Sequence, residues 1–349
     1  MRLSMLLLCI VVLAQAQKIG PPIAILPPGT TTAVRVYYAT DRNAGVGVDT
    51  KHMYTAARDQ LGTVSYGTCI VTIPRSHVLG SLEEPGIFEF SEDATKHVIL
   101  QKVETTSNQN FYNLVRARIS ESDRRDAFIF IHGFDTTFHD AARRTAQIAY
   151  DLKFEGAAIF YSWPSRGKTS QYLVDETNAD WTIPHLIAFL TEFRAKSGAS
   201  RVHIIAHSMG ARVLTRALRE LSPGALGSTT FNQIILAAPD IDADTFNGLA
   251  HAIRHTGERI TLYASSNDRA IKMSKSIHGY ARAGESGKGV VVVPEIDTID
   301  ASSVDTDFFA HSYFAGRTVL SDLFLLIKYD LPPSARFALF PNGWPALCV

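Results

Sequence analysis

The sequence predicts an α/β fold in which helices cover both faces of a mostly parallel central sheet, preceded by an antiparallel β extension. From about residue 127, apolar runs of strand length alternate with amphipathic helix patterns, as in chains that build parallel sheets from strand–helix units. The strand runs are apolar throughout, which is typical of strands buried on both faces. With 349 residues, 46% of them hydrophobic, the chain is long enough to bury such a core.

Each predicted element of this region follows from its spacing of apolar residues. Strands are expected at residues 127–131, 157–161, 202–205, 234–238, 260–264 and 290–293. Helices are expected at 138–152, 183–193, 213–221, 246–253, 270–276 and 318–329, with Pro184 near the start of the second. Right-handed crossovers place every strand-to-helix loop at one edge of such a sheet, so that edge is where we expect a site.

Residues 17–120 differ from the alternating region. A proline-rich leader at 20–29 precedes short strand-like runs at 34–39, 67–73, 98–103 and 111–118, separated by turns with proline, glycine or asparagine. We therefore expect an N-terminal β-rich extension that continues the sheet as scaffold, followed by a catalytic core at residues 121–349.

The N-terminus has the features of a secretory signal peptide. Arg2 supplies a positive charge, Leu3–Leu13 an apolar stretch, and Ala14-Gln15-Ala16 a small-residue cleavage site. We expect residues 1–16 to be removed after Ala16 and the protein to be exported, either secreted or periplasmic. The apolar stretch is too short for a stable membrane span, and no other segment has the required length and apolarity.

The charge balance limits the partners that we expect, and the cysteine content limits the disulfides that can form. The 34 basic and 34 acidic residues balance, and no basic run is present, so nucleic acid is not an expected partner. Cys9 leaves with the signal peptide, while Cys69 and Cys348 remain. Two interpretations stay open: a disulfide that ties the last residues to the N-terminal region, or two unpaired thiols.

The segment Ala206-His207-Ser208-Met209-Gly210 predicts a nucleophile elbow. An apolar strand run comes directly before it and an amphipathic helix directly after it, which is the strand–tight turn–helix arrangement of this motif. The tight turn pushes the Ser208 hydroxyl out of the sheet and places it near a helix N-terminus, which favours developing negative charge. The usual pattern is G-x-S-x-G, and alanine stands here at the first glycine.

A serine nucleophile needs a base to take its proton and an acid to orient that base. Asp268 follows the strand predicted at 260–264, and His311 follows the last predicted strand. The resulting chain order of Ser208, Asp268 and His311 is the order expected for a triad on this kind of sheet. We therefore predict that these three residues are catalytic.

Other acids and histidines remain as alternatives. Asp240 and Asp242 follow the preceding strand, where some sheets place the acid, and either side chain is also suited to cap a helix near residue 243. His255 and His278 are rival bases, but both lie in helical or charged surroundings away from a strand end. We favour the triad above and leave the two alternative acids open.

Acyl chemistry also requires hydrogen-bond donors for the oxyanion. We expect one from the backbone N–H of Met209, directly after the nucleophile, and a second from the N–H of Phe134, in the glycine-containing loop after the first parallel strand. The sequence holds no H-E-x-x-H motif, no Cys/His cluster at metal spacing and no G-x-G-x-x-G after a strand. Neither a metal nor a cofactor is therefore expected.

Five segments between residues 127 and 315 carry a resemblance to a known superfamily. They are Phe128–Phe134, Tyr161–Gly167, Ala206–Arg212, Leu236–Asp242 and Ala310–Tyr313. In these segments the chain resembles the α/β-hydrolase superfamily, and more narrowly an uncharacterised esterase/lipase-like group of exported hydrolases. The segments Val36–Arg42 and Tyr66-Gly67 are similar to the N-terminal part of that group. The resemblance implies an α/β-hydrolase fold and a Ser-His-Asp hydrolase acting on acyl bonds, in a superfamily that includes inactive members.

We therefore expect an exported serine hydrolase that cleaves carboxylic esters of a small molecule or lipid through an acyl-enzyme. A peptidase or thioesterase with the same triad, or a catalytically silent binding protein, is the alternative. Residues 165–180 are expected to form at most a small lid. An apolar pocket around Ser208 is expected from Phe134, Phe138, Trp163, Met209, Phe308, Phe309 and Tyr313.

Overall fold

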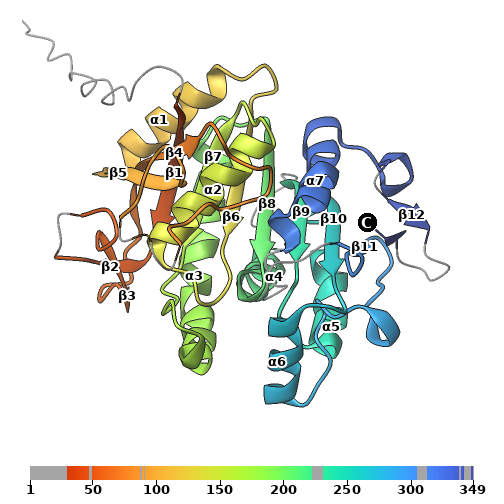
Figure 1. The fold of residues 1–349 in the computed structure, drawn as a ribbon. Coiled ribbons are helices and arrows are strands. Elements are labelled where there is room, and N and C mark those ends of the chain that lie inside the picture. The colour runs from red at the N-terminus through yellow and green to blue at the C-terminus, as the bar shows by residue number, and fades with distance from the viewer. Residues whose placement is uncertain are drawn as a thin grey trace, which may run out of the picture.

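The computed structural model describes residues 30–46, 49–86, 89, 91–221, 231–304, 313–337, 339–341 and 347–348. The predicted signal peptide and proline-rich leader lie outside these residues. No helix in the described part of the chain is both long enough and apolar enough to cross a bilayer. Figure 1 shows the strands side by side, with the N-terminal strands at one end of the sheet and the C-terminal strands at the other.

Eleven strands of the described residues form one sheet, in the order β12-β13-β11-β10-β9-β8-β6-β7-β1-β4-β5 (Figure 1). A separate two-stranded sheet pairs β2 with β3. The strands are β1 (Thr31–Thr40), β2 (Arg42–Ala44), β3 (Tyr54–Arg58), β4 (Ser65–Pro74), β5 (Ile99–Thr106), β6 (Asp126–Ile131), β7 (Ala157–Ser162), β8 (Arg201–His207), β9 (Phe231–Ala237), β10 (Gly257–Ala264), β11 (Asp297–Asp300), β12 (Phe340–Pro341) and β13 (Leu347–Cys348).

The sheet is mostly parallel, as predicted. Strands β7, β6, β8, β9, β10 and β11 pair in parallel, and β1 joins them in parallel with β7. Antiparallel pairing is found at β1–β4 and β4–β5, in the N-terminal part of the chain, and at β12–β13. From β6 the chain goes first to its neighbour β7 and then to β8 on the other side. Ligand sites in such sheets lie outside the carboxyl ends of the strands at this reversal.

Seven α-helices of the described residues cover the two faces of the sheet. They are α1 (Asn108–Ser120), α2 (Phe138–Asp151), α3 (Tyr172–Lys196), α4 (Met209–Leu221), α5 (Ala243–Ile253), α6 (Arg269–His278) and α7 (Arg317–Tyr329). Short 3₁₀ turns occur at Thr169–Gln171, Gly287–Gly289, Tyr313–Ala315 and Pro333–Ala335.

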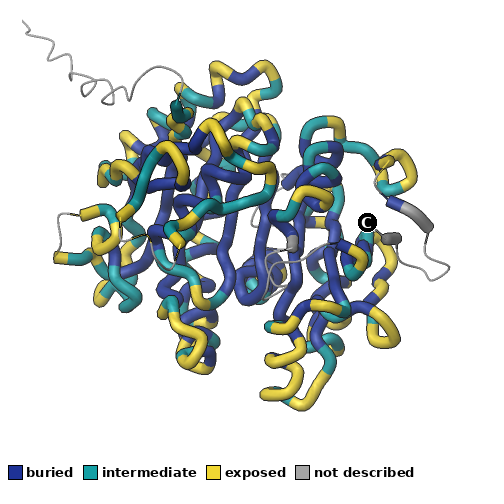
Figure 2. The backbone as a smooth tube through the Cα atoms, viewed as in Figure 1, coloured by how far each residue is buried: buried dark blue, intermediate teal, exposed yellow. Residues whose placement is uncertain are grey.

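Two apolar cores result, one on each face, because successive strand residues point to opposite sides. Ile129 of β6 and Ile204 of β8 pack with α1, α3, α4 and α5. Their neighbours Phe128 and Ile205 pack with α2 and α7 on the other face. The central strands are buried along their whole length (Figure 2). The near-continuous apolar runs of the sequence are the consequence of this double burial.

Ten of the twelve elements predicted for the alternating region are found within a few residues of their expected bounds; the helix at 183–193 and the strand at 290–293 differ. The helix is longer than expected, because α3 begins at Tyr172 and holds Pro184 in its interior. The strand prediction is wrong: Val291 and Val293 are buried against the core without strand pairing, and β11 at Asp297–Asp300 pairs with β10 instead.

The strand predicted at 111–118 is also wrong, because this segment lies in helix α1. The side chain of Ser107 accepts a hydrogen bond from the Asn110 N–H and caps the helix. The buried residues Phe111, Val115 and Ile119 recur every four positions, which is a helical spacing. A short run of mixed apolar and polar residues fits both periods, and packing against β4 and β7 decides between them.

The two remaining cysteines lie too far apart for a disulfide. Cys69 is in β4 and is a free, buried thiol, whereas Cys348 is in β13. Eight strand-to-strand steps separate β4 from β13, which is a distance on the order of 40 Å at the usual strand spacing. A disulfide requires Cα atoms within about 7 Å, so the interpretation as unpaired thiols holds for Cys69.

Candidate active site

The carboxyl ends of the central strands are level with one another. Ile131 of β6 is paired with Ala206 of β8, and Ala237 of β9 is paired with both His207 of β8 and Tyr263 of β10. The loops that follow these strands therefore leave the sheet at the same edge. These loops hold the residues predicted for acyl chemistry.

Ser208 occupies the sharp turn between β8 and α4. Its φ is 52°, a left-handed value that is uncommon for residues other than glycine and costs free energy. Both backbone polar groups of Ser208 are hydrogen-bonded, which holds the turn in place. The Ser208 N–H donates to Ala237 O at 2.9 Å, and the Ser208 carbonyl accepts from the Asp240 N–H at 3.2 Å. The side chain is 1% exposed, and its Oγ has no hydrogen-bond partner among the described residues. The geometry is that of a nucleophile elbow.

Two glycines let neighbouring backbone approach this turn closely. A Cβ on Gly210 would lie 2.4 Å from the His132 carbonyl oxygen and 2.6 Å from that of Ile131. A Cβ on Gly133 would lie 2.9 Å from Ser208 Cβ. Side chains at either position would therefore force the loop after β6 away from the serine. Ala206, at the other position of the motif, is fully buried in the apolar core, where its methyl group is accommodated.

The loop after β6, residues 132–136, is hereafter called the oxyanion loop because it lies against Ser208. Met209, the other predicted source of an oxyanion donor, is the first residue of α4. N–H groups in the first turn of a helix have no partner within the helix and carry partial positive charge. The Phe134 ring packs edge-on against Tyr172 of α3, with the ring centroids 5.2 Å apart.

His132 at the start of the oxyanion loop is a buried, neutral imidazole. Burial, reinforced by the nearby Arg42 charge, lowers the pKa of its ring to about 3. Its Nδ1 lies 2.8 Å from the Gly133 carbonyl oxygen, and its own carbonyl accepts a hydrogen bond from Trp163 Nε1 at 2.7 Å. Because it is neutral and Nδ1 faces a carbonyl acceptor, the ring proton is assigned to Nδ1.

Asp268 lies at the same edge as Ser208, four residues after the end of β10. Its side chain is fully buried, and Oδ1 caps α6 by accepting the Ile271 N–H at 3.0 Å. A carboxylate held in this way has a fixed orientation, which is what an acid that orients an imidazole must have.

The two alternative acids, Asp240 and Asp242, accept hydrogen bonds that have structural roles. Asp240 is buried and accepts hydrogen bonds from the Tyr172 hydroxyl, from Ser274 Oγ at 2.6 Å and from Arg282 Nε at 2.7 Å. Its carboxylate therefore links α3, α6 and the loop around residue 282. Asp242 caps α5 by accepting the Thr245 N–H at 2.8 Å.

His311, the predicted base, lies in residues 305–312, outside the described part of the chain. The described residues on both sides of this segment contact the site. On one side, Ser302 accepts hydrogen bonds from the Ser266 N–H and from Asn267 Nδ2, both at 2.7 Å. On the other side, the Phe314 ring stacks on the His207 ring with centroids 4.3 Å apart.

The two rival bases, His278 and His255, have hydrogen-bond partners other than Ser208. His278 is at the end of α6, with Nδ1 2.8 Å from the Ser274 carbonyl and Nε2 3.0 Å from a carboxylate oxygen of Glu176. His255 accepts a hydrogen bond from Arg254 after α5.

A cavity of about 390 Å³ opens beside the oxyanion loop. Its apolar wall comes from several elements, while its charged groups come from the ends of α2 and α6 and from the loop itself. Apolar side chains lining it are Leu82, Phe130, Phe134, Met273 and Phe314, and charged ones are Asp135, Asp140, Arg144 and Arg269. Such a volume suits a small organic ligand.

The composition of this cavity corrects part of the predicted lining. Phe134 lines it, as expected, but Phe138, Trp163 and Met209 are buried in the two cores and do not. The side chains of Phe308, Phe309 and Tyr313 are outside the described part of the structure. The sequence pattern did not indicate Phe130, because it places this residue inside a buried strand. Only the structure shows that Phe130 lies close enough to the end of β6 to reach the cavity.

The segment between β4 and β5 crosses α2 and brings Leu82 to the cavity. Arg143 of α2 donates to the Val98 and Glu83 carbonyls, and His77 lies 2.8 Å from both Glu83 and Asp151. Burial by itself lowers the pKa of His77, but its hydrogen bonds to the two carboxylates outweigh this effect and raise it. The imidazole therefore links this segment to α2 through Asp151.

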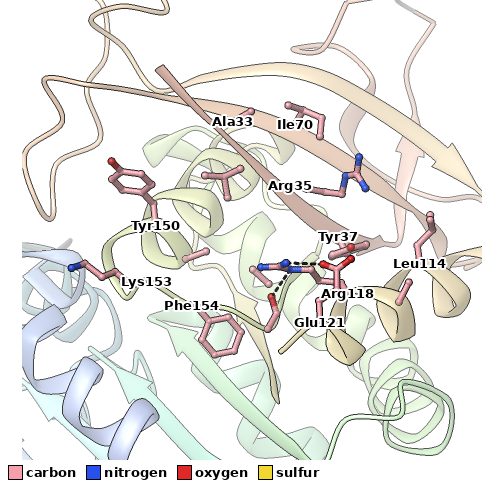
Figure 3. Close-up of a pocket in the computed structure, with 15 residues that line it drawn as sticks. Ala33, Arg35, Tyr37, Ile70, Leu114, Arg118, Glu121, Tyr150, Lys153 and Phe154 are labelled. Atoms are coloured by element: carbon pink, nitrogen blue, oxygen red, sulfur yellow. Dashed lines mark hydrogen bonds and ion pairs between the residues drawn. The ribbon is translucent and has the colours of Figure 1, made fainter. Parts of the chain in front are cut away.

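Another cavity, of about 620 Å³, lies at the opposite edge of the sheet, where β1 begins and α1 and α2 end (Figure 3). Arg35, Tyr37, Arg118 and Lys153 are among its lining residues, and Arg118 donates to Glu121 and to the Gly156 carbonyl across its floor. It shares no lining residue with the cavity beside the oxyanion loop.

Within the described ranges, no group of His, Cys, Asp and Glu side chains is placed to hold a metal ion. The described part of the site combines a strained serine, a buried carboxylate, helix-terminal N–H groups and an apolar cavity.

A nucleophile elbow at the carboxyl edge of a mostly parallel sheet, with helices on both faces, defines the α/β hydrolases. The chain belongs to the family described as "Alpha/beta hydrolase of unknown function (DUF900)", which matches residues 107–326. A stretch of 79 residues is 33% identical to the uncharacterized protein alr1448 of Nostoc sp.. This stretch covers 23% of the chain and only 21% of that relative.

Two solved structures are similar at low identity. A predicted CIB-like hydrolase from Thermoplasma acidophilum is 15% identical with a TM-score of 0.32, covering 65% of this chain and 92% of that one. Brefeldin A esterase, a bacterial homologue of human hormone sensitive lipase, is 13% identical with a TM-score of 0.29, covering 86% of this chain and 68% of its own.

Proposed function

We propose that the protein is an exported serine hydrolase that cleaves carboxylic esters, with Ser208 as nucleophile. The observation that carries the proposal is the turn at Ser208. Its backbone is strained, its hydroxyl lacks a partner among the described residues, and a glycine-bearing loop lies against it. Strain of this kind persists where function requires it.

His311 takes the proton of Ser208 as general base, and Asp268 holds the imidazole and stabilises its charged form. The described flanks of segment 305–312 support this assignment. Phe314 is three residues from His311, a span of at most about 10 Å, and its ring stacks on His207, the neighbour of Ser208. Ser302, near the other end, is bound to the loop that holds Asp268.

The reaction then follows acyl-transfer chemistry. Ser208 Oγ attacks the ester carbonyl, and the N–H groups of Met209 and Phe134 stabilise the tetrahedral oxyanion. The alcohol leaves with the proton from His311, which gives an acyl-enzyme. Water, activated by the same imidazole, releases the acid and restores the serine.

The cavity supports small esters as substrates. Its volume of about 390 Å³ and its apolar wall suit a short acyl or aromatic group. Residues 165–180, expected to form a small lid, consist largely of a 3₁₀ turn and the first turns of α3, and Thr169 borders the cavity. We therefore propose esterase action on soluble small-molecule esters ahead of lipase action at an oil interface.

Labelling with a fluorophosphonate tests the nucleophile. The wild type is expected to react and Ser208→Ala to fail, with loss of p-nitrophenyl ester turnover. Ser286→Ala is a matched control, because Ser286 is also buried with an unpartnered Oγ among the described residues. Turnover of peptides or thioesters instead of oxygen esters would reassign the class, and an unlabelled wild type would favour a silent binding protein. Mass spectrometry of the exported chain tests removal of residues 1–16.

A further inference from the structure

Arg42, in the N-terminal extension, places a fully buried guanidinium behind the oxyanion loop. Burial lowers its pKa to about 10, so it is charged at neutral pH. Five contacts occupy its five N–H donors. Nε donates to Ser162 Oγ at 2.8 Å; Nη1 donates to the carbonyls of Ser165 at 2.9 Å and Thr55 at 3.3 Å; Nη2 donates to the Thr136 carbonyl at 2.8 Å and lies 3.4 Å from His132 Nε2.

The position of Arg42 is itself fixed by its neighbours. Asp41 is fully buried, and its Oδ2 accepts hydrogen bonds from the Thr182 hydroxyl, from Tyr161 OH at 3.0 Å and from His185 Nδ1 at 2.9 Å. Thr40 Oγ1 donates to the Ser162 carbonyl at 2.6 Å. The two residues that precede Arg42 are therefore bound to α3 and β7.

Arg42 favours one tautomer of His132 both directly and through Ser162. The Nε2 of His132 lies 3.4 Å from Arg42 Nη2 and 3.2 Å from Ser162 Oγ, the hydroxyl that accepts from Arg42 Nε. A guanidinium offers only donors, so the nearby Nε2 of the neutral imidazole acts as acceptor. The proton then resides on Nδ1, which donates to the Gly133 carbonyl at 2.8 Å. The imidazole therefore connects the guanidinium to a backbone carbonyl of the oxyanion loop.

That carbonyl controls the direction of the predicted oxyanion donor. The Gly133 C=O and the Phe134 N–H belong to one planar trans peptide unit, in which they point in opposite directions. Holding the carbonyl toward His132 fixes the Phe134 N–H on the opposite side. Gly133 itself lies against Ser208, since a Cβ there would approach Ser208 Cβ to 2.9 Å.

We propose that Arg42 is a positioning residue, which acts through His132 to lock the Gly133–Phe134 peptide in the orientation that serves the oxyanion. The proposal rests on the hydrolase function proposed above. It assigns a role in the reaction to an extension that its sequence pattern marks only as scaffold. Binding of the Thr136 carbonyl by the same guanidinium holds the other end of the loop.

Arg42→Met tests the role of the guanidinium. Loss of one oxyanion donor costs about 10²–10³ in rate, so kcat for a p-nitrophenyl ester is expected to fall about 100-fold with little change in KM. A trifluoromethyl ketone, which forms an oxyanion on the serine, is expected to bind more weakly by the same factor. Arg42→Lys restores only part of the rate, because one ammonium cannot replace the planar fork.

Arg201→Met is the matched control for loss of a paired arginine. Arg201 pairs with Asp330 at the opposite end of β8, far from the oxyanion loop. The Arg201→Met variant is expected to be less stable than the wild type but to keep its kcat. His132→Asn, whose amide N–H can replace Nδ1–H, is expected to retain more kcat than His132→Leu.

Nitrogen-15 NMR of the His132 ring provides a readout that does not require turnover. The wild type is expected to show the Nδ1–H tautomer, and Arg42→Met a mixed tautomer with a raised His132 pKa. An unchanged tautomer, or wild-type kcat in folded Arg42→Met, would overturn the proposal, as would a loss no greater than in Arg201→Met. If the wild type itself neither turns over esters nor reacts with fluorophosphonate, the hydrolase proposal fails, and the tautomer alone then decides whether Arg42 orders the loop.

Discussion

Asparagine in place of Asp268 tests the acid of the proposed triad with little change in shape. The carboxylate is fully buried and caps α6 through the Ile271 N–H. Asparagine is about as good a helix cap as aspartate, so stability is expected to change by less than about 1 kcal/mol. An amide cannot stabilise the imidazolium and favours the wrong tautomer of the base. Losses of about 10⁴-fold in kcat follow from such a change in serine hydrolases.

Asp240→Asn is the matched comparison, because the structure predicts the opposite outcome. Asp240 is paired with Arg282, and both side chains are only 3% exposed. Removing the charge from one member of a buried pair costs about 3–5 kcal/mol at most. We therefore expect Asp240→Asn to lower the free energy of unfolding strongly while the folded fraction keeps most of its kcat.

Thermal unfolding and p-nitrophenyl ester turnover, measured on both variants, separate the two effects. The expected pattern is a catalytic loss in one variant and a stability loss in the other. Similar losses of kcat in the two, or a larger loss in Asp240→Asn after correction for the folded fraction, would refute the assignment of Asp268.

Three further predictions follow from individual contacts. Gly210→Ala should destabilise the protein by about 1–3 kcal/mol in thermal unfolding, because its Cβ would meet a backbone oxygen at 2.4 Å; an unchanged melting temperature would contradict the close packing of the elbow. The pKa of His77 is raised in the fold, so protonated His77 stabilises the folded state fully below the ordinary pKa of about 6.5, and this stabilisation is lost as pH rises through the raised pKa. The difference in unfolding free energy between wild type and His77→Gln, measured in unfolding titrations, should therefore shrink over that rise in pH. Cys69 and Cys348 lie eight strand steps apart, so reductant should leave the melting temperature unchanged, and a mass showing one intramolecular disulfide between them would contradict the strand order.

Local patterns in the sequence were sufficient for the strand–helix alternation and for the turn at Ser208. Apolar runs such as that of β6 reveal burial on both faces directly, and Gly210 marks a place without room for a side chain. The pattern was not sufficient for α1, because its short run of apolar residues fits a strand as well as a helix. Pro184 was misplaced for a similar reason, since local preference puts proline at a helix start and packing keeps it within α3.

What the sequence by itself determined is the class of fold and the turn at Ser208, because both depend on residues close together along the chain. The roles of Ser208, Asp268 and His311 stay predictions from the order in which they follow the strands. Only the tertiary structure decided that Asp240 forms an ion pair with Arg282, that Phe130 and Phe314 line the cavity, and that the N-terminal extension contacts the oxyanion loop through Arg42. Arg42 and His132 are 90 residues apart, and no local pattern encodes a hydrogen bond over that separation. Contacts of this kind arise from the packing of whole elements, which fixes distances that sequence spacing leaves free.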